Sequence, residues 1–449
     1  MTGSIEIHVD PPHSMVDESL GIRLTGLESG QHVTVRASQT DDHQRTWRAH
    51  ATFVADAKGQ IDVAAQAPVS GTYADADAMG LIWSMELAAD EPNQAPFFRN
   101  VPTPLPIEFV AEVDNAMVAR TTVERRYAAD GVERIPVRAE GLVGTLFVPP
   151  GAGPHPVVIT LSGSGGGLSE GGAALYASHG YAGFALAYFN YEDLPNDLIE
   201  IPLEYFETAI RWLQRQPRLD GDRIAVSGAS RGGELVLLLG ATFPAVKAVI
   251  AYVPSGVVHG GIGRSGVRGA SPAWTFHGEA IPYLQPRAEK LSPEPPPPPQ
   301  GEPIALTPRF LRFLEDEEAA ERAEIPVERI NGPVLLISGK DDAMWPSERL
   351  AEIARRRLEE HHFPHPYRHL AYDGAGHMIG MPYMPTTTLA SRHPLTGELF
   401  AYGGTPKAYA AARRDSWRDI LKMLDETFGP TYAQTGLFQE GGIHAGSGR

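Results

Sequence analysis

The chain of 449 residues contains no cysteine, and this absence excludes several kinds of chemistry at once. Without thiols there is no disulfide framework, no zinc–thiolate site and no cysteine nucleophile. Long apolar runs of the kind that cross a membrane are also missing. The first residues, from Met1, lack the basic stretch and apolar core of a secretory signal. We therefore expect a cytoplasmic protein, and nothing in the sequence indicates a metal site or an organic cofactor.

Positive charge is also scarce. The chain has 38 lysines and arginines against 55 acidic residues, which gives a net charge of −17. Nucleic acids and anionic membranes are bound through basic patches, so we expect neither as a partner. A protein with this net negative charge can still have a local basic pocket that binds a small anionic substrate. The length exceeds that of one ordinary hydrophobic core and predicts at least two domains.

Residues 1–125 predict an all-β domain. Apolar and polar residues alternate with a period of two over Ile5–Val9 and Val33–Ser38, and clusters of glycine, proline and serine separate such segments. Strands at this spacing favour a β-sandwich. We predict a further strand over Leu81–Leu87 and another over Ile107–Val113, with no long helix in this part of the chain.

Residues 126–429 predict an α/β domain, in which short apolar strands alternate with helices and form a mostly parallel sheet covered on both faces. The expected strands include 157–161, 183–188, 224–226, 246–252, 334–338 and 367–372; the expected helices include 171–179, 203–214, 234–242, 309–324, 347–360 and 407–428. A Gly- and Pro-rich insertion over about 255–330 interrupts this rhythm, and we expect it to act as a lid. Residues 430–449 predict a loose tail.

The segment around Ser230 carries the strongest catalytic signal. An apolar strand ends in Gly228-Ala229-Ser230-Arg231-Gly232, and a helical pattern follows directly. A Gly-x-Ser-x-Gly turn between a strand and a helix is the nucleophile elbow, which raises a serine hydroxyl at the tip of a sharp turn. The backbone N–H of Arg231 would then face the developing oxyanion. An ordinary Gly-Ser turn is the competing interpretation.

Two later segments could supply the partners of this serine. One strand ends at Asp341-Asp342 and the next ends before His377, and open α/β sheets place their sites at such strand ends. Ser230, Asp342 and His377 follow each other in the order of the α/β-hydrolase triad. His377 would accept the serine proton, and Asp342 would orient the imidazole. Asp341 is the alternative for the last role.

The glycine-rich loop that begins at Gly163 has two interpretations. Because it lies between a strand and a helix, it could bind a phosphate or dinucleotide, but its spacing does not match Gly-x-Gly-x-x-Gly. We favour the second wall of an oxyanion hole, formed by N–H groups near Gly163 and Ser164. The remaining candidate substrate-binding residues are Gly165, Gly166, Tyr188 and Asn190.

Several motifs together resemble one known family. They are Ser162-Gly-Ser-Gly-Gly-Gly-Leu168, Ala187-Tyr-Phe-Asn-Tyr-Glu-Asp-Leu-Pro195, Ser230-Arg-Gly-Gly-Glu234 and Tyr402-Gly-Gly-Thr-Pro406. The chain resembles the type I acyl-CoA thioesterases and the bile acid-CoA:amino acid N-acyltransferases over nearly its whole length. The resemblance implies an N-terminal β-sandwich before an α/β-hydrolase domain, and an acyl-enzyme formed on Ser230.

The nucleophile indicates which reaction to expect. The amino-acid-conjugating members of the family use cysteine, whereas this chain has serine, which favours hydrolysis by water. We therefore predict a serine acyl-CoA thioesterase whose substrate is an acyl-CoA or an acyl thioester on a carrier protein. The alternatives are an acyltransferase or cyclase that passes the acyl group to an amine or alcohol, and an esterase or amidase using the same triad. We expect a monomer or a small homo-oligomer.

Overall fold

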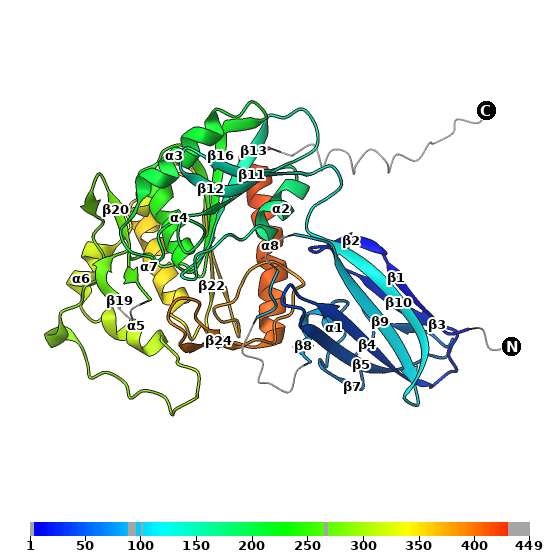
Figure 1. The fold of residues 1–449 in the computed structure, drawn as a ribbon. Coiled ribbons are helices and arrows are strands. Elements are labelled where there is room, and N and C mark those ends of the chain that lie inside the picture. Colours follow the sequence, from blue (N-terminus) through cyan, green and yellow to red (C-terminus); the bar gives the residue numbers. More distant parts are fainter. Residues whose placement is uncertain (1–3, 89–95, 100–101, 265–267, 430–449) are drawn as a thin grey trace.

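The computed structural model describes residues 4–88, 96–99, 102–264 and 268–429 (Figure 1). The tail predicted over residues 430–449 lies outside these ranges. Within them, no helix combines the length and the apolar character that crossing a bilayer requires.

The N-terminal part of the chain forms two facing β-sheets, as the alternating sequence predicts. One sheet has the order β1 (Glu6–Asp10), β3 (Gly21–Thr25), β6 (Ile61–Asp62). The other has the order β2 (His13–Met15), β10 (Ala116–Arg126), β9 (Leu105–Val113), β4 (His32–Thr40), β5 (Thr46–Val54), β7 (Ser70–Gly71), with β8 (Glu86–Leu87) also paired to β5. Val33, Val35 and Ala37 of β4 point into the core between the sheets, while the residues between them face outward.

The strand predicted over Leu81–Leu87 is wrong for most of its length. The structure has a short helix, α1 (Gly80–Trp83), followed by the two-residue strand β8. All four residues of α1 are buried, and the Trp83 indole donates a hydrogen bond to Asp77. A continuous apolar run does not distinguish a buried helix from a buried strand, and here packing inside the sandwich selects the helix.

The larger domain is built on an eight-stranded sheet. Its order is β11 (Glu133–Ala139), β12 (Leu142–Val148), β14 (Ala182–Ala187), β13 (His155–Leu161), β16 (Leu219–Ala229), β17 (Val246–Tyr252), β22 (Val334–Gly339), β23 (Tyr367–Tyr372). β12 runs antiparallel to both of its neighbours, and all pairs from β14 to β23 are parallel. This is the α/β-hydrolase architecture expected from the sequence, and it brings the carboxyl ends of β16, β22 and β23 to one edge.

Helices cover both faces of this sheet (Figure 1). α3 (Leu203–Gln214), α4 (Arg231–Thr242) and α7 (Ser347–Glu360) pack on one face, and α2 (Gly171–Ser178) and α8 (Pro406–Phe428) pack on the other. The amphipathic spacing of α3 places Leu203, Phe206 and Ile210 in the core.

The insertion between β17 and β22 packs against the face of the sheet that α3 and α4 cover, and residues such as Trp274 and Ile325 share its hydrophobic core. It contains β18 (Gly260–Ile262), β19 (Arg268–Pro272), β20 (Trp274–Phe276), β21 (Glu279–Ala280), α5 (Thr307–Phe313) and α6 (Glu317–Ala323), with two 3₁₀ turns, Ala288–Lys290 and Val327–Arg329. β20 and β21 join β15 (Ile201–Pro202) in a small sheet. The single helix predicted over 309–324 is instead two helices, because Asp316 leaves helical geometry and caps α6 through the N–H of Ala319.

The two domains contact each other through specific polar groups. The buried Asp17 carboxylate of the N-terminal domain accepts a hydrogen bond from the Trp417 indole at 2.8 Å and pairs with His179 at 2.6 Å. From the larger domain, Thr386 and Thr387 donate hydrogen bonds to the backbone carbonyls of Trp83 and Met85 in the N-terminal domain. Near these threonines a hairpin, β24 (Ala390–Arg392) with β25 (Leu399–Ala401), extends toward the edge of the sheet where the catalytic candidates lie.

Candidate active site

Ser230 lies in a strained turn between β16 and α4. Its backbone has φ 58° and ψ −119°, a conformation that residues with a side chain rarely adopt. The glycines on either side are required by close packing: a Cβ on Gly228 would lie 2.3 Å from the Gly232 carbonyl oxygen, and one on Gly232 would lie 2.5 Å from that of Ser162. The Gly-x-Ser-x-Gly segment therefore has the geometry of a nucleophile elbow.

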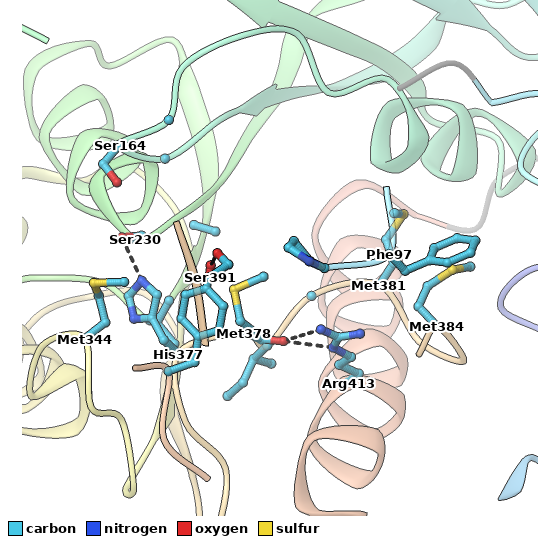
Figure 2. Close-up of a pocket in the computed structure, with 18 of the residues that line it drawn as sticks. Phe97, Ser164, Ser230, Met344, His377, Met378, Met381, Met384, Ser391 and Arg413 are labelled. Carbon is cyan, nitrogen blue, oxygen red and sulfur yellow. Dashed lines mark hydrogen bonds between the residues drawn. The ribbon is translucent and has the colours of Figure 1, made fainter. Parts of the chain in front are cut away.

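The structure brings Ser230, His377 and Asp342 together although they are far apart in the sequence. His377 Nε2 lies 2.9 Å from Ser230 Oγ (Figure 2), and His377 Nδ1 lies 2.8 Å from the Asp342 carboxylate. The other carboxylate oxygen of Asp342 accepts from the N–H groups of Met344 and Trp345 at 2.9 and 3.3 Å. These bonds fix the carboxylate beneath the imidazole, and the Asp342 side chain is only 1% exposed.

Asp341, the alternative partner for the histidine, is exposed at the surface. The two aspartates follow β22 in succession, so their side chains leave the backbone in different directions. Asp342 is held by a bridge with Gly403 from the segment before α8, whereas Asp341 contributes its N–H to Ala375. The choice between the two residues therefore depends on the tertiary contacts of this loop.

Two backbone segments oppose each other across Ser230. Arg231 is the first residue of α4, so its N–H has no acceptor within the helix and lies at the positive end of the helix dipole. Gly163 lies on the other side, and a Cβ there would be 3.3 Å from Ser230 Cβ. Gly163, Ser164 and Gly165 all line the cavity that contains Ser230. This placement is compatible with the oxyanion-hole interpretation.

The other candidate substrate contacts lie behind the glycine-rich loop. Tyr188 is buried and donates to the carbonyl of Ser162 at 2.7 Å, and Asn190 donates to that of Gly165 at 2.8 Å. Gly166 has φ +64°, and a Cβ on it would lie 2.7 Å from the Phe189 carbonyl oxygen. None of these three residues is part of the lining of the two cavities described below. Their positions stabilise the loop that faces Ser230.

Two cavities meet at Ser230. The interdomain cavity, of about 390 Å³, is lined by residues of both domains, among them Phe97, Met378, Met381, Met384 and Arg413 (Figure 2). The insertion cavity, of about 500 Å³, is lined by residues of the insertion, among them Ile262, Leu284, Ala288, Phe310 and Phe313. Both cavities share Ser164, Ser230, Met344, His393 and Phe400, so they approach the nucleophile from different sides.

The described cavity-lining residues include several arginines, although the protein as a whole is acidic. Among the residues that the structure describes, neither cavity is lined by an aspartate or glutamate. The interdomain cavity includes Arg99 and Arg413, and the insertion cavity includes Arg231, Arg309 and Arg312. Two further cations are engaged by other side chains: Lys340 pairs with Asp373 at 2.8 Å, and Arg264 donates to Asn190. The Arg231 guanidinium is buried and engaged by backbone carbonyls.

A buried polar network connects the elbow with the insertion. Arg231 donates to the carbonyls of His259 and Gly260 at 2.8 and 3.0 Å, and it pairs with Glu234 at 3.1 Å. The other partners of Glu234 are the Trp274 indole at 2.8 Å and the N–H of His259 at 3.2 Å. Burial raises the pKa of the Glu234 carboxyl to about 7, and the facing guanidinium opposes this shift.

Sequence reasoning did not identify His393, Arg413 or the four methionines of the interdomain cavity as part of the site. These residues have no motif of their own. His393 and Arg413 line the cavity because the hairpin and α8 fold against the edge of the sheet, whereas the methionines follow Asp342 or His377 closely in the chain. For the methionines the available signal was their closeness in the sequence to Asp342 and His377.

Comparison with known proteins identifies the family to which this chain belongs. Residues 201–430 match the family model described as "BAAT / Acyl-CoA thioester hydrolase C terminal", and residues 17–139 match "Acyl-CoA thioester hydrolase/BAAT N-terminal region". The chain belongs to the acyl-CoA thioester hydrolase/BAAT family. The resemblance seen in the sequence motifs is thereby confirmed.

Relatives within the family align over almost the whole chain. A protein of Mus musculus named peroxisomal succinyl-coenzyme A thioesterase is 34% identical and covers 95% of this chain and 98% of its own length. Acyl-coenzyme A thioesterase 1 of Rattus norvegicus is 33% identical, covering 92% and 94%. The mitochondrial acyl-coenzyme A thioesterase 2 of Mus musculus is 33% identical, covering 94% and 89%. The protein is therefore an enzyme of the hydrolase class.

Proposed function

We propose that the protein is a serine acyl-CoA thioesterase that forms an acyl-enzyme on Ser230. The observation that carries this proposal is the continuous hydrogen-bonded chain from Ser230 Oγ through His377 to Asp342, in a chain that belongs to a thioester hydrolase family. The strained elbow supports it, because backbone strain of this kind is found where a nucleophile must be presented.

The first half of the reaction transfers the acyl group to the enzyme. Ser230 Oγ attacks the thioester carbonyl carbon while His377 Nε2 accepts the hydroxyl proton. The oxyanion receives hydrogen bonds from the N–H of Arg231 and from the loop that begins at Gly163. The carbon–sulfur bond then breaks, and the thiolate leaves as a thiol with the proton from His377. Asp342 stabilises the imidazolium throughout.

The second half releases the acid. A water molecule attacks the seryl ester, His377 takes its proton, and the ester bond to Ser230 breaks with that proton returned to the serine oxygen. The products are a carboxylic acid and the free thiol of coenzyme A. Serine at position 230 favours water as the acceptor, as the sequence indicates, and the alternatives with an amine or alcohol are tested by adding such acceptors to the assay.

The pair of cavities supports a substrate with two large parts on either side of the reacting carbonyl. An acyl thioester has such a form, with the acyl chain on one side and the pantetheine arm on the other. Both cavities are mainly apolar and fall in the size range of small-molecule sites, and their described lining residues include arginines but no carboxylate. The positive charge suits the phosphates of coenzyme A, and a carrier protein presenting the same arm is the alternative donor.

The experiment is a measurement of thiol release from a panel of acyl-CoAs by the wild type, Ser230→Ala and Ser178→Ala. Ser178 lies on α2 and contacts the backbone of Ala129 and Ala174, so its variant controls for the loss of a serine hydroxyl elsewhere. We expect turnover to vanish only in Ser230→Ala. Cleavage of simple esters but of no thioester would leave the triad in place and reject the substrate class; turnover unchanged in Ser230→Ala would reject the mechanism.

Cellular location and assembly stay predictions. The relatives named above include one described as peroxisomal and one described as mitochondrial, so family membership does not specify a compartment. Cell fractionation would test the cytoplasmic location expected from the sequence. Light scattering would test whether the protein is a monomer or a small homo-oligomer.

A further inference from the structure

We propose that the side chain of Ser164, and not only the backbone around it, takes part in catalysis by donating a hydrogen bond to the oxyanion, and that His393 positions it. This inference rests on the proposed thioesterase function. It assigns a catalytic role to one hydroxyl and a positioning role to one histidine, which lie 229 residues apart in the chain.

Ser164 lies where a donor to the oxyanion is required. It lines both cavities together with Ser230, and Figure 2 shows its hydroxyl on the side of the loop that faces Ser230. Gly163, the residue before it, approaches Ser230 so closely that a Cβ would lie 3.3 Å from the Ser230 Cβ. The hydroxyl therefore belongs to the same wall as the N–H groups of Gly163 and Ser164, opposite the N–H of Arg231.

The surroundings of His393 determine which ring nitrogen carries a proton. Its Nδ1 accepts from the backbone N–H groups of Leu395 and Thr396, at 3.3 and 3.4 Å. An Nδ1 that faces two donors has no hydrogen of its own, so the neutral ring carries its hydrogen on Nε2. His393 Nε2 lies 2.9 Å from Ser164 Oγ and thus donates to it.

This direction of donation has a chemical consequence. If Ser164 Oγ accepts from His393, the hydroxyl hydrogen is not used in that bond and can point into the cavity. A hydroxyl whose oxygen accepts a hydrogen bond is also a stronger donor, because linked hydrogen bonds polarise each other. The pair is thus arranged to offer a hydrogen to a negatively charged oxygen that develops beside Ser230.

The hairpin holds His393 firmly. Its N–H donates to the carbonyl of Glu398 at 2.8 Å, and its own carbonyl accepts from Gly397 at 2.9 Å. Phe400 packs edge-on against the imidazole, with ring centroids 5.9 Å apart. A preorganised donor needs no rearrangement when charge develops, which is the condition for effective oxyanion stabilisation.

The test uses matched pairs of variants: Ser164→Thr keeps the hydroxyl and Ser164→Val removes it at equal volume, while His393→Gln keeps a donor and His393→Leu removes it. We measure kcat and KM for an acyl-CoA and for a p-nitrophenyl ester. Loss of one oxyanion donor typically costs about 10²-fold in kcat, so we expect this for Ser164→Val with little change in KM. Ser164→Thr and His393→Gln should retain most of the activity.

Two further measurements separate catalysis from packing. The double variant Ser164→Val/His393→Leu should be no slower than Ser164→Val alone, since His393 acts through the hydroxyl. A trifluoromethyl ketone analogue of the substrate, which forms a hemiketal oxyanion on Ser230, should bind Ser164→Val weaker by the factor lost in kcat/KM.

The outcomes distinguish this inference from the function on which it rests. Unchanged kcat in Ser164→Val, with Ser230→Ala inactive, would overturn the role of Ser164 and leave the thioesterase intact. If the losses in kcat of the two single variants multiplied in the double variant, the two residues would act independently, and the inference would be overturned. A rise in KM with unchanged affinity for the analogue would show that the contact is only structural, and would also overturn the inference. A wild type that hydrolyses esters but no thioester would reject the proposed substrate while Ser164 is still tested on the ester.

Discussion

The carboxylate of Glu234 lies 3.1 Å from the guanidinium of Arg231, and both side chains are buried directly behind the nucleophile. The same two groups hold the backbone of residues 259 and 260 and the Trp274 indole, all within the insertion. The pair therefore connects the helix that begins at the elbow with the layer that forms one cavity wall. Burying two charged groups costs desolvation energy that their attraction offsets only in part, so the pair adds little net stability. We therefore expect its main effect to be the positioning of the insertion against the elbow.

Removing one member of this pair should be strongly destabilising. Arg231→Met leaves the Glu234 carboxylate buried without its partner, and we expect a loss of about 3–5 kcal/mol in the free energy of unfolding. Urea denaturation measures this loss. The control is Arg211→Met, which breaks an exposed ion pair with Glu207 and should change stability by less than about 1 kcal/mol. Equal effects of the two variants would show that the buried pair has no special role.

The assignment of Asp342 over Asp341 predicts a large kinetic difference between neighbours. Asp342→Asn removes the carboxylate that lies 2.8 Å from His377 and should lower kcat by about 10⁴-fold, as expected when the imidazole loses its orienting charge. Asp341→Asn changes an exposed side chain and should leave kcat within about twofold of the wild type. Steady-state thiol release measures both; the reverse order of effects would contradict the triad.

Two adjacent glycines of the loop provide a test of its close packing. Gly166 and Gly167 both have positive φ, so alanine is strained at either position. Only at Gly166 would the new Cβ collide, with the Phe189 carbonyl oxygen at 2.7 Å, whereas at Gly167 nothing lies within 4 Å. We expect Gly166→Ala to lower kcat at least tenfold more than Gly167→Ala. Similar activities would show that the loop tolerates displacement.

The two cavities should control different parts of the substrate. Ala288 lines the insertion cavity and Gly380 the interdomain cavity, and a Cβ on Gly380 would meet nothing within 4 Å. Ala288→Trp and Gly380→Trp therefore narrow one cavity each with little disturbance of the core. We expect one variant to shift the preferred acyl chain length and the other to raise KM for all acyl-CoAs alike. The same response from both would contradict separate acyl and carrier sites.

Asp17 makes the contact between the domains dependent on pH. Burial alone would raise the pKa of this carboxyl, but hydrogen bonds from His179 and Trp417 lower it below its usual value. The unfolded chain then binds more protons than the folded one, so this stabilisation is complete above the unfolded pKa, about 3.9, and is lost as the pH falls through the folded value.

Asp17→Asn should therefore be less stable at neutral pH, and its difference from the wild type should shrink in acid. Urea midpoints between pH 7 and pH 3 measure this. Asp130→Asn, at a carboxylate that is 95% exposed, is the control and should follow the wild type throughout. A difference that grows in acid would show that the sign of the coupling is wrong.

Elements with a strong local period were predictable from the sequence. Two helices and two strands occupy the predicted residues: Leu203–Gln214, Ser347–Glu360, Val246–Tyr252 and Tyr367–Tyr372. Amphipathic helices and buried strands each have a characteristic pattern of apolar residues, which can be read from the sequence. The elbow around Ser230 was predictable for a similar reason: its glycines and serine are neighbours in the chain and their steric requirement is local.

Other features depended on the fold. The apolar run that includes Trp83 became a helix because the sandwich core accommodates it in that form, and Asp342 rather than Asp341 faces His377 because segments 30 and 60 residues away fix its loop. His393 reaches Ser164 across 229 residues. The sequence by itself thus determined the family, the sheet and the order of the three candidate catalytic residues, since local patterns encode them. Only the tertiary structure decided which side chains surround these three residues, because contacts between distant segments leave no periodic signal in a single chain.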